Sequence, residues 1–291
     1  MRKLAISLIV FDLLMVYSFA IRVELAAALA LLVASVLFGL VGSIIAARRL
    51  YFLAGASPHS ALFAALSAVI VAYWLGIGLS SMYALYTLSI LIGVIVIYFA
   101  GYLIFKGIDP DLATSILVAF ASSFSVLAAY YIKTSLPVPF DIMSVVFGDP
   151  LLVTPRELVI ASIVAAITIV GVVLTFDAQI YLGVDRDSAL LTGAPIWLYD
   201  LVFFTLLGAV VVSLIRVVGF VLEHILILLP GALGAGYGKG SREAVVVSLV
   251  ASLTAGSLGM LISMVVPVSP SGATGVSMLL IYAVASLYRR Q

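Results

Sequence analysis

Residues 216–232 read RVVGFVLEHILILLPGA and place a carboxylate, Glu223, and an imidazole, His224, in one of the most apolar parts of the chain. An ionisable group in the hydrocarbon of a membrane costs about 2.5–3.5 kcal/mol on insertion scales, so it marks a functional site by default. Gly219 stands before the two residues and Pro230 after them, and both residue types interrupt helices. Many transporters line their substrate path with interrupted helices beside buried charge. The stretch therefore predicts a broken membrane helix that carries a functional site.

The composition indicates an integral membrane protein. Hydrophobic residues make up 65% of the 291 residues and charged residues only 9%. A soluble domain carries about 25% charged residues, so this chain could not cover its surface in water. The net charge of +1 argues against a nucleic-acid footprint, which needs a concentrated basic patch. The chain has no cysteine, which excludes disulfides, thiolate zinc sites, iron–sulfur clusters and cysteine nucleophiles.

Apolar segments long enough to cross a bilayer follow one another along the whole chain. With basic pairs such as Arg48-Arg49 on the cytoplasmic side, they predict about ten crossings, with eight or nine as alternatives, and both termini in the cytoplasm. Residues 1–291 are thus expected to form one all-α transmembrane permease domain in the cell membrane. The expected crossings are residues 4–20, 25–46, 57–78, 82–105, 110–131, 158–176, 197–215, 219–235, 244–266 and 274–288.

Known catalytic and nucleotide-binding motifs are absent from the sequence. It contains no GxxxxGK[ST], HExxH or GxSxG, so we expect a transporter rather than an enzyme, with its energy drawn from an ion gradient or from a separate subunit. A carrier driven by an ion gradient usually has acidic residues in several helices. Only Asp12 and Glu223 look deep here, which favours an external ATPase. A stand-alone carrier driven by an ion gradient remains the alternative from another class.

Five blocks of sequence resemble, in the same order, the permease subunits of zinc/manganese/iron-type ABC importers. They are spread over the chain from about residue 30 to the C-terminus, and together they are a fairly specific signal. The blocks are LFGLVGSIIAARRLYFLAGASPHSAL (37–62), VFGDPLLVTPRELV (146–159), FDAQIYLGVDRDSALLTGAP (176–195), VVSLIRVVGFVLEHILILLPGALG (211–234) and VSPSGATGVSMLLIYAVASL (268–287).

The resemblance implies a fold similar to the cobalamin/siderophore-type importer permeases and a homodimer of this chain in membrane lipid. It also implies a cytoplasmic ABC ATPase subunit and an extracellular substrate-binding protein, the latter docking near residues 133–150 and 267–273. Alternating access at the homodimer interface would move a divalent metal ion, which is zinc, manganese or iron. No cofactor is expected on the chain itself, and no nucleic acid. A permease for a non-metal small solute is the alternative within this family.

Three residues are candidate ligands for the transported metal: His59, Glu223 and His224. His59 matches the histidine of the family's early block, and a neutral imidazole there could ligate a divalent cation transiently. A carboxylate with two imidazoles would suit zinc or manganese. The structural alternatives are that His59 lies at a helix start and bonds to backbone, and that Glu223 and His224 are a buried pair satisfied by Arg216 or by Ser or Thr on adjacent helices.

Two segments are candidates for contact with the ATPase. In the related permeases a short cytoplasmic helix docks into the ATPase, and by resemblance it maps onto residues 234–246, with residues 185–195 as a second candidate. An ordinary solvated turn is the structural alternative for the first segment. The candidate residues are Gly238, Lys239, Ser241, Arg242 and Glu243 in the first segment, and Asp185 and Asp187 in the second.

Overall fold

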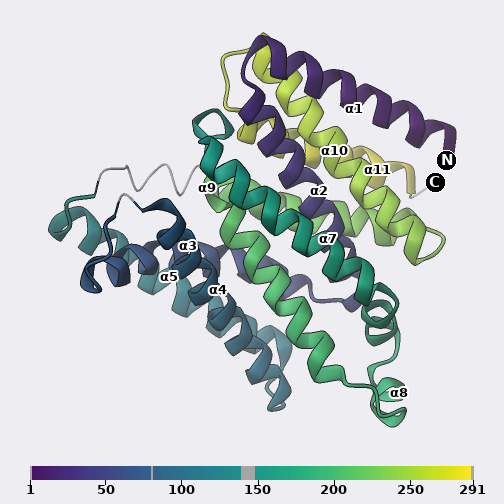
Figure 1. The fold of residues 1–291 in the computed structure, drawn as a ribbon. Coiled ribbons are helices and arrows are strands. Elements are labelled where there is room, and N and C mark those ends of the chain that lie inside the picture. Colours follow the sequence, from purple (N-terminus) through teal and green to yellow (C-terminus); the bar gives the residue numbers. More distant parts are fainter. Residues whose placement is uncertain (1, 80, 139–147, 290–291) are drawn as a thin grey trace.

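A computed structural model describes the chain except for residues 1, 80, 139–147 and 290–291 (Figure 1). The part of the chain that it describes is helical throughout and has no strand, which confirms the expected all-α class. The elements are α1 (Arg2–Arg22), α2 (Leu25–Arg48), α3 (Tyr51–Trp74), α4 (Met82–Phe105), α5 (Pro110–Ser135), the 3-10 turn η1 (Pro150–Leu152), α7 (Pro155–Val184), α8 (Arg186–Leu191), α9 (Ile196–Tyr237), α10 (Ser241–Val265) and α11 (Pro270–Arg289).

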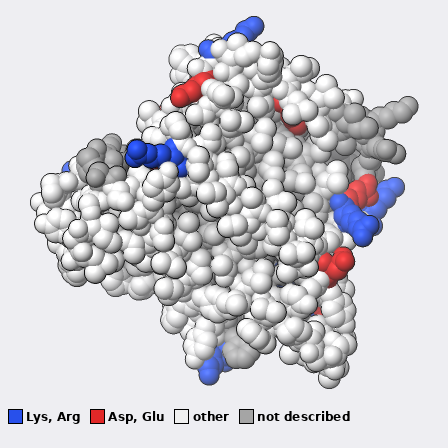
Figure 2. Space-filling model, viewed as in Figure 1, with Lys and Arg blue, Asp and Glu red and all other residues white. Residues whose placement is uncertain are grey.

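Within the described part of the chain, eight helices, α2 to α5, α7 and α9 to α11, are long and apolar enough to cross a membrane. α9 has 42 residues, and its backbone is not helical at Gly219, so it forms two segments. The number of spans agrees with the predicted eight to ten. The uncharged surface that lipid requires is visible in Figure 2, where most of the face shown carries no charged side chain.

Local signals in the sequence set several helix starts. α5 and α7 begin at a proline, which needs no hydrogen-bond partner for its nitrogen at the first helical position. The Asp109 carboxylate caps α5 by accepting hydrogen bonds from the next backbone amides at 3.0 and 3.1 Å. Thr154 and Glu157 form a reciprocal capping box at the start of α7. These starts fix where α5 and α7 enter the bundle.

α9 reverses direction at Gly219, so its two segments pack against different groups of helices (Figure 1). The first segment begins beside the end of α2, where Asp200 pairs with Arg48. The second segment comes back toward that same end, because Gly231 packs directly on Gly42 of α2. We call this side of the bundle the Arg48 end and the opposite side the Gly219 end. The two crossings predicted at residues 197–215 and 219–235 are thus both present.

The break itself depends on glycine. Gly219 has φ 80° and ψ 159°, a combination that is essentially restricted to glycine. Gly148, just before η1, also has a positive φ, and a Cβ added there would lie 2.1 Å from the backbone nitrogen of Gly219. The chain before η1 therefore packs backbone against backbone on the turn of α9.

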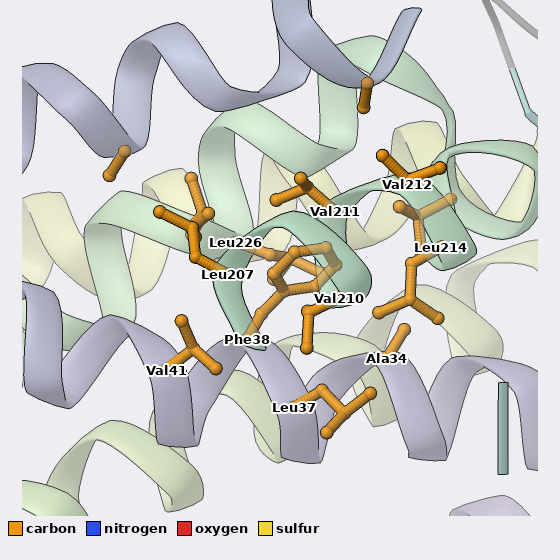
Figure 3. Packing of buried hydrophobic residues seen from close by; sticks show 14 of the residues in the cluster. Ala34, Leu37, Phe38, Val41, Leu207, Val210, Val211, Val212, Leu214 and Leu226 are labelled. Atoms are coloured by element: carbon orange, nitrogen blue, oxygen red, sulfur yellow. The ribbon is translucent and has the colours of Figure 1, made fainter. Parts of the chain in front are cut away.

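The core of the bundle forms where α2 meets both segments of α9. Side chains of α2 interlock there with side chains from each side of the break (Figure 3). Lipid is as apolar as these residues, so close packing rather than exclusion from water holds the helices together. The residues labelled in Figure 3 are Ala34, Leu37, Phe38 and Val41 of α2 and Leu207, Val210, Val211, Val212, Leu214 and Leu226 of α9.

Replacing Gly219 with alanine is expected to destabilise the bundle by about 1–3 kcal/mol, because alanine must adopt a strained backbone conformation. Thermal unfolding of the purified protein in detergent measures this as a lower midpoint. Gly272→Ala is the matched control, since a Cβ there meets no atom within 4 Å. Equal midpoints for the two variants would contradict the role given to Gly219.

Candidate functional site

Two imidazoles from different helices meet beside the break in α9. His59 of α3 and His224 of the second α9 segment have ring centroids 5.2 Å apart, with planes at 86°. Phe220 completes a three-ring cluster, with centroids 4.9 Å from His59 and 4.5 Å from His224. Both histidines are half-buried. The structure therefore brings together two of the three predicted metal ligands.

A hydroxyl on a third helix orients His59. Ser122 of α5 has its Oγ 2.7 Å from His59 Nδ1, so one helix positions the imidazole of another. Pro58 precedes His59 inside α3 and cannot donate to the carbonyl of Ala54, one turn back. The Ser57 hydroxyl donates to that carbonyl instead, at 2.7 Å, and α3 continues as a helix. The alternative of a histidine at a helix start is therefore wrong.

The backbone holds the ring of His224. Its Nδ1 lies 2.7 Å from the carbonyl oxygen of Phe220. A carbonyl only accepts hydrogen bonds, so Nδ1 carries the proton and donates. The imidazole is thus fixed in orientation before any ligand arrives.

Glu223 lies apart from the two imidazoles. Its side chain is fully buried, and neither carboxyl oxygen has a hydrogen-bond partner among the described residues. Adjacent helical residues point about 100° apart, so Glu223 and His224 face different directions. Nowhere in the described chain do three His, Asp or Glu side chains gather as a metal site would require. The structure does not place Glu223 with His59 and His224.

Arg216 has a different acidic partner from the one considered in the sequence. Its Nε lies 3.2 Å from Glu157 Oε1 at the start of α7, and the Tyr86 hydroxyl donates to the same oxygen at 3.3 Å. The hypothesis that Arg216 satisfies Glu223 is therefore wrong, because Glu223 accepts no hydrogen bond. Sequence reasoning missed Glu157 as a buried partner. Its one local signal was the TPRE capping box, which predicts a helix start but no ion pair.

A short separate helix exists at the Arg48 end, but in the second of the two candidate segments. It is α8, and the Asp185 carboxylate caps it by accepting hydrogen bonds from the Ser188 hydroxyl and from the Ser188 backbone amide at 2.9 Å. These hydrogen bonds hold the pKa of Asp185 below its usual range, so the cap stays charged at neutral pH. Asp187 is exposed in the first turn of α8.

The first candidate segment is a tight turn between two long helices. α9 ends at Tyr237, Gly238 follows, and α10 begins at Ser241. The Lys239 amide donates to Glu243 at 2.9 Å, which closes the turn. The short helix expected within residues 234–246 is therefore absent there. Arg242 is exposed beside this turn.

The two buried glutamates are expected to respond in opposite ways to leucine. Glu223→Leu removes a carboxyl that has no partner, so stability should stay level or rise by about 1–3 kcal/mol. Glu157→Leu removes the ion-pair partner of Arg216 and the acceptor of the Tyr86 hydroxyl, and it should cost about 3–5 kcal/mol. Thermal unfolding in detergent measures both. A loss of stability in Glu223→Leu as large as that in Glu157→Leu would contradict this difference between the two glutamates.

Comparisons with known proteins agree with this architecture. A "Probable metal transport system membrane protein" of Thermotoga maritima is 28% identical over 223 residues, 76% of this chain and 74% of the relative. A protein of the same name from Treponema pallidum is 25% identical over 249 residues, 85% of this chain and 89% of the relative. The solved structure of PsaBC from Streptococcus pneumoniae in complex with Fab includes a chain of the same fold. That chain has a TM-score of 0.76 and 20% identity, over 92% of this chain and 93% of its own length.

The sequence model of one family matches nearly the whole chain. Residues 7–289 match the ABC 3 transport family, a range that includes both histidines, the break in α9 and α8. The resemblance drawn from the five blocks is thereby confirmed. The chain belongs to the ABC 3 transport family and is a multi-pass membrane permease.

Proposed function

We propose that the chain is the permease subunit of an ATP-driven importer for a divalent metal ion, which is zinc, manganese or iron. The observation that carries the proposal is the pairing of His59 and His224, two half-buried imidazoles beside a broken helix. Relatives named for metal transport support the choice of cargo. Imidazole nitrogen suits zinc and iron, whereas manganese, like magnesium and calcium, is better suited to oxygen ligands.

The geometry favours weak and transient coordination. Two imidazoles supply at most two ligands, whereas a tightly bound zinc needs four. Ser122 and Phe220 complete the immediate surroundings of His59, and neither is a strong metal ligand. The remaining coordination positions would be filled by water or by the second copy of a homodimer. An ion held in this way can leave when the site changes shape.

Glu223 would join His59, in place of His224, only in another conformation. The second segment of α9 would have to rotate about its own axis by about 100° to bring Glu223 toward the position of His224. Gly219 is the place where such a rotation could occur without breaking a regular helix. We therefore keep Glu223 as a ligand of an alternate state of the permease.

We assign the Arg48 end to the cytoplasm and the Gly219 end to the outside, which puts both termini inside. Arg48-Arg49, Lys106 and Lys239 gather at the Arg48 end, as the positive-inside rule requires. α8 and the turn from Gly238 to Glu243 lie at that end as well and would face a separate ATPase subunit. The extracellular binding protein would dock at the other end. Part of its expected surface, residues 139–147, lies outside the described residues.

Loss of either imidazole is expected to reduce metal uptake by about tenfold or more, since each supplies a ligand. Uptake of radioactive zinc, manganese or iron into proteoliposomes with the partner ATPase tests His59→Ala and His224→Ala. Ser122→Ala should reduce uptake less, because it only orients His59. Ser115→Ala, a hydroxyl of α5 bonded to its own helix, is the matched control.

Two outcomes would contradict the metal site. Uptake at the wild-type rate by both histidine variants would show that neither His59 nor His224 lies on the transport path. A wild-type complex whose ATP hydrolysis does not respond to zinc, manganese or iron would point to a non-metal solute.

Reversing the charge at Arg242 is expected to weaken binding of the ATPase by about 2 kcal/mol, because an interfacial arginine often dominates such contacts. Co-purification of the ATPase with Arg242→Glu measures this. Lys106→Glu is the control, an exposed basic residue at the same end between α4 and α5. If no ATPase binds the wild type and Arg242→Glu transports normally, the chain is a stand-alone carrier.

A further inference from the structure

One carboxylate at the Arg48 end joins three elements. Asp200, near the start of α9, accepts the guanidinium of Arg48 on Oδ1 and that of Arg186 on Oδ2, the latter at 2.7 Å. Arg48 is the last residue of α2, and Arg186 is the first residue of α8. The carboxylate therefore bridges α2, α8 and α9 through two charge-assisted hydrogen bonds.

The two ion pairs differ in how well they are shielded from water. The Arg48 side chain is 4% exposed and that of Arg186 is 45% exposed, with Asp200 between them at 15%. Arg48 is also fixed by the Gln179 side-chain oxygen at 3.0 Å, and its guanidinium lies 5.0 Å from the centre of the Phe203 ring. A buried pair of this kind is costly to separate, whereas an exposed pair opens easily. The pair of Arg48 with Asp200 is the permanent half of the bridge, and the pair with Arg186 is the adjustable half.

Arg48 stands directly before a sharp turn that leads to the histidine site. Arg49 has φ 57°, the one positive φ of a non-glycine residue in the described chain. We call residues 45–51 the α2–α3 elbow. The amides of Arg49 and Leu50 close it by donating to carbonyls of the last turn of α2 at 3.2 and 3.0 Å. α3 then starts, and His59 follows about 12 Å further along its axis.

We propose that Asp200 is the positioning residue that transmits movement of α8 to the α2–α3 elbow and so to His59. A displacement of α8 acts first on Arg186, then on the shared carboxylate, and then on Arg48. Because Arg48 is buried and held on several sides, it moves together with the end of α2. The proposal rests on the proposed function in one respect, which is that α8 meets the ATPase. The alternative is that Asp200 only tethers α8 locally.

Hydrogen exchange, measured by mass spectrometry on the permease alone in lipid nanodiscs, tests the mechanical link without any ATPase. Arg186→Gln should speed exchange both in α8 and at the elbow amides, by about fivefold or more at the elbow. Arg186→Lys, which keeps the charge, should restore part of the protection. Arg156→Gln, an exposed arginine at the Gly219 end, is the matched control and should leave the elbow unchanged. Faster exchange confined to α8 would show a local tether and overturn the proposal.

Transport by the reconstituted complex tests the functional consequence. With Arg186→Gln the ATPase should still bind and hydrolyse ATP, while the number of metal ions moved per ATP falls by about fivefold or more. Arg186→Lys should recover part of that ratio. A fall of hydrolysis and transport in equal proportion would mean that Arg186 only docks the ATPase, and it would overturn the relay. Absence of any ATP-dependent metal uptake in the wild type would instead contradict the proposed function, while hydrogen exchange at the elbow would still decide whether the mechanical link exists.

Discussion

The backbone contact between Gly148 and the break at Gly219 is the constraint on which the rest of the bundle depends. Lipid offers no hydrogen-bond partner, so a membrane chain can leave the helical conformation only where protein covers the exposed backbone. Here the backbone of Gly148 provides that cover. It lies so close that a Cβ added at Gly148 would be 2.1 Å from the backbone nitrogen of Gly219. Because α9 can turn there, its first segment contacts α4 and α7, its second contacts α10 and α11, and α2 packs against both. The second segment then presents His224 to His59.

Much of this architecture could be predicted from short-range features of the sequence. The apolar segments give the number of spans, and Gly219 marks the turn, because hydropathy and glycine act through the residues beside them. The confirmed family resemblance rests on blocks of the same kind. His59 was identified in the same way, although its location inside α3 depends on the hydroxyl of Ser57 replacing the hydrogen bond that Pro58 cannot make.

Long-range pairing was not predictable from the sequence. The pair of Glu157 and Arg216 and the pair of Arg48 and Asp200 each join residues far apart in the chain. No local sequence feature indicates which residue pairs with which. The direction in which Glu223 points is likewise set by the rotation of a helix segment about its axis, which depends on every helix around it. The short helix expected within residues 234–246 is absent there, whereas the second candidate segment does contain one, because Asp185 caps the start of α8.

Glu223 and His224 show that the role of an ionisable residue in a membrane helix can be assigned only when its partners are known. Both stood out in the sequence, yet the Glu223 carboxyl is buried without a hydrogen-bond partner among the described residues, and His224 is half-buried against a second imidazole. A carboxylate in that surrounding must become neutral or move to meet a cation. An imidazole can stay neutral and still offer a lone pair. The resting site therefore belongs to His59 and His224, and any part for Glu223 requires the turn at Gly219 to move.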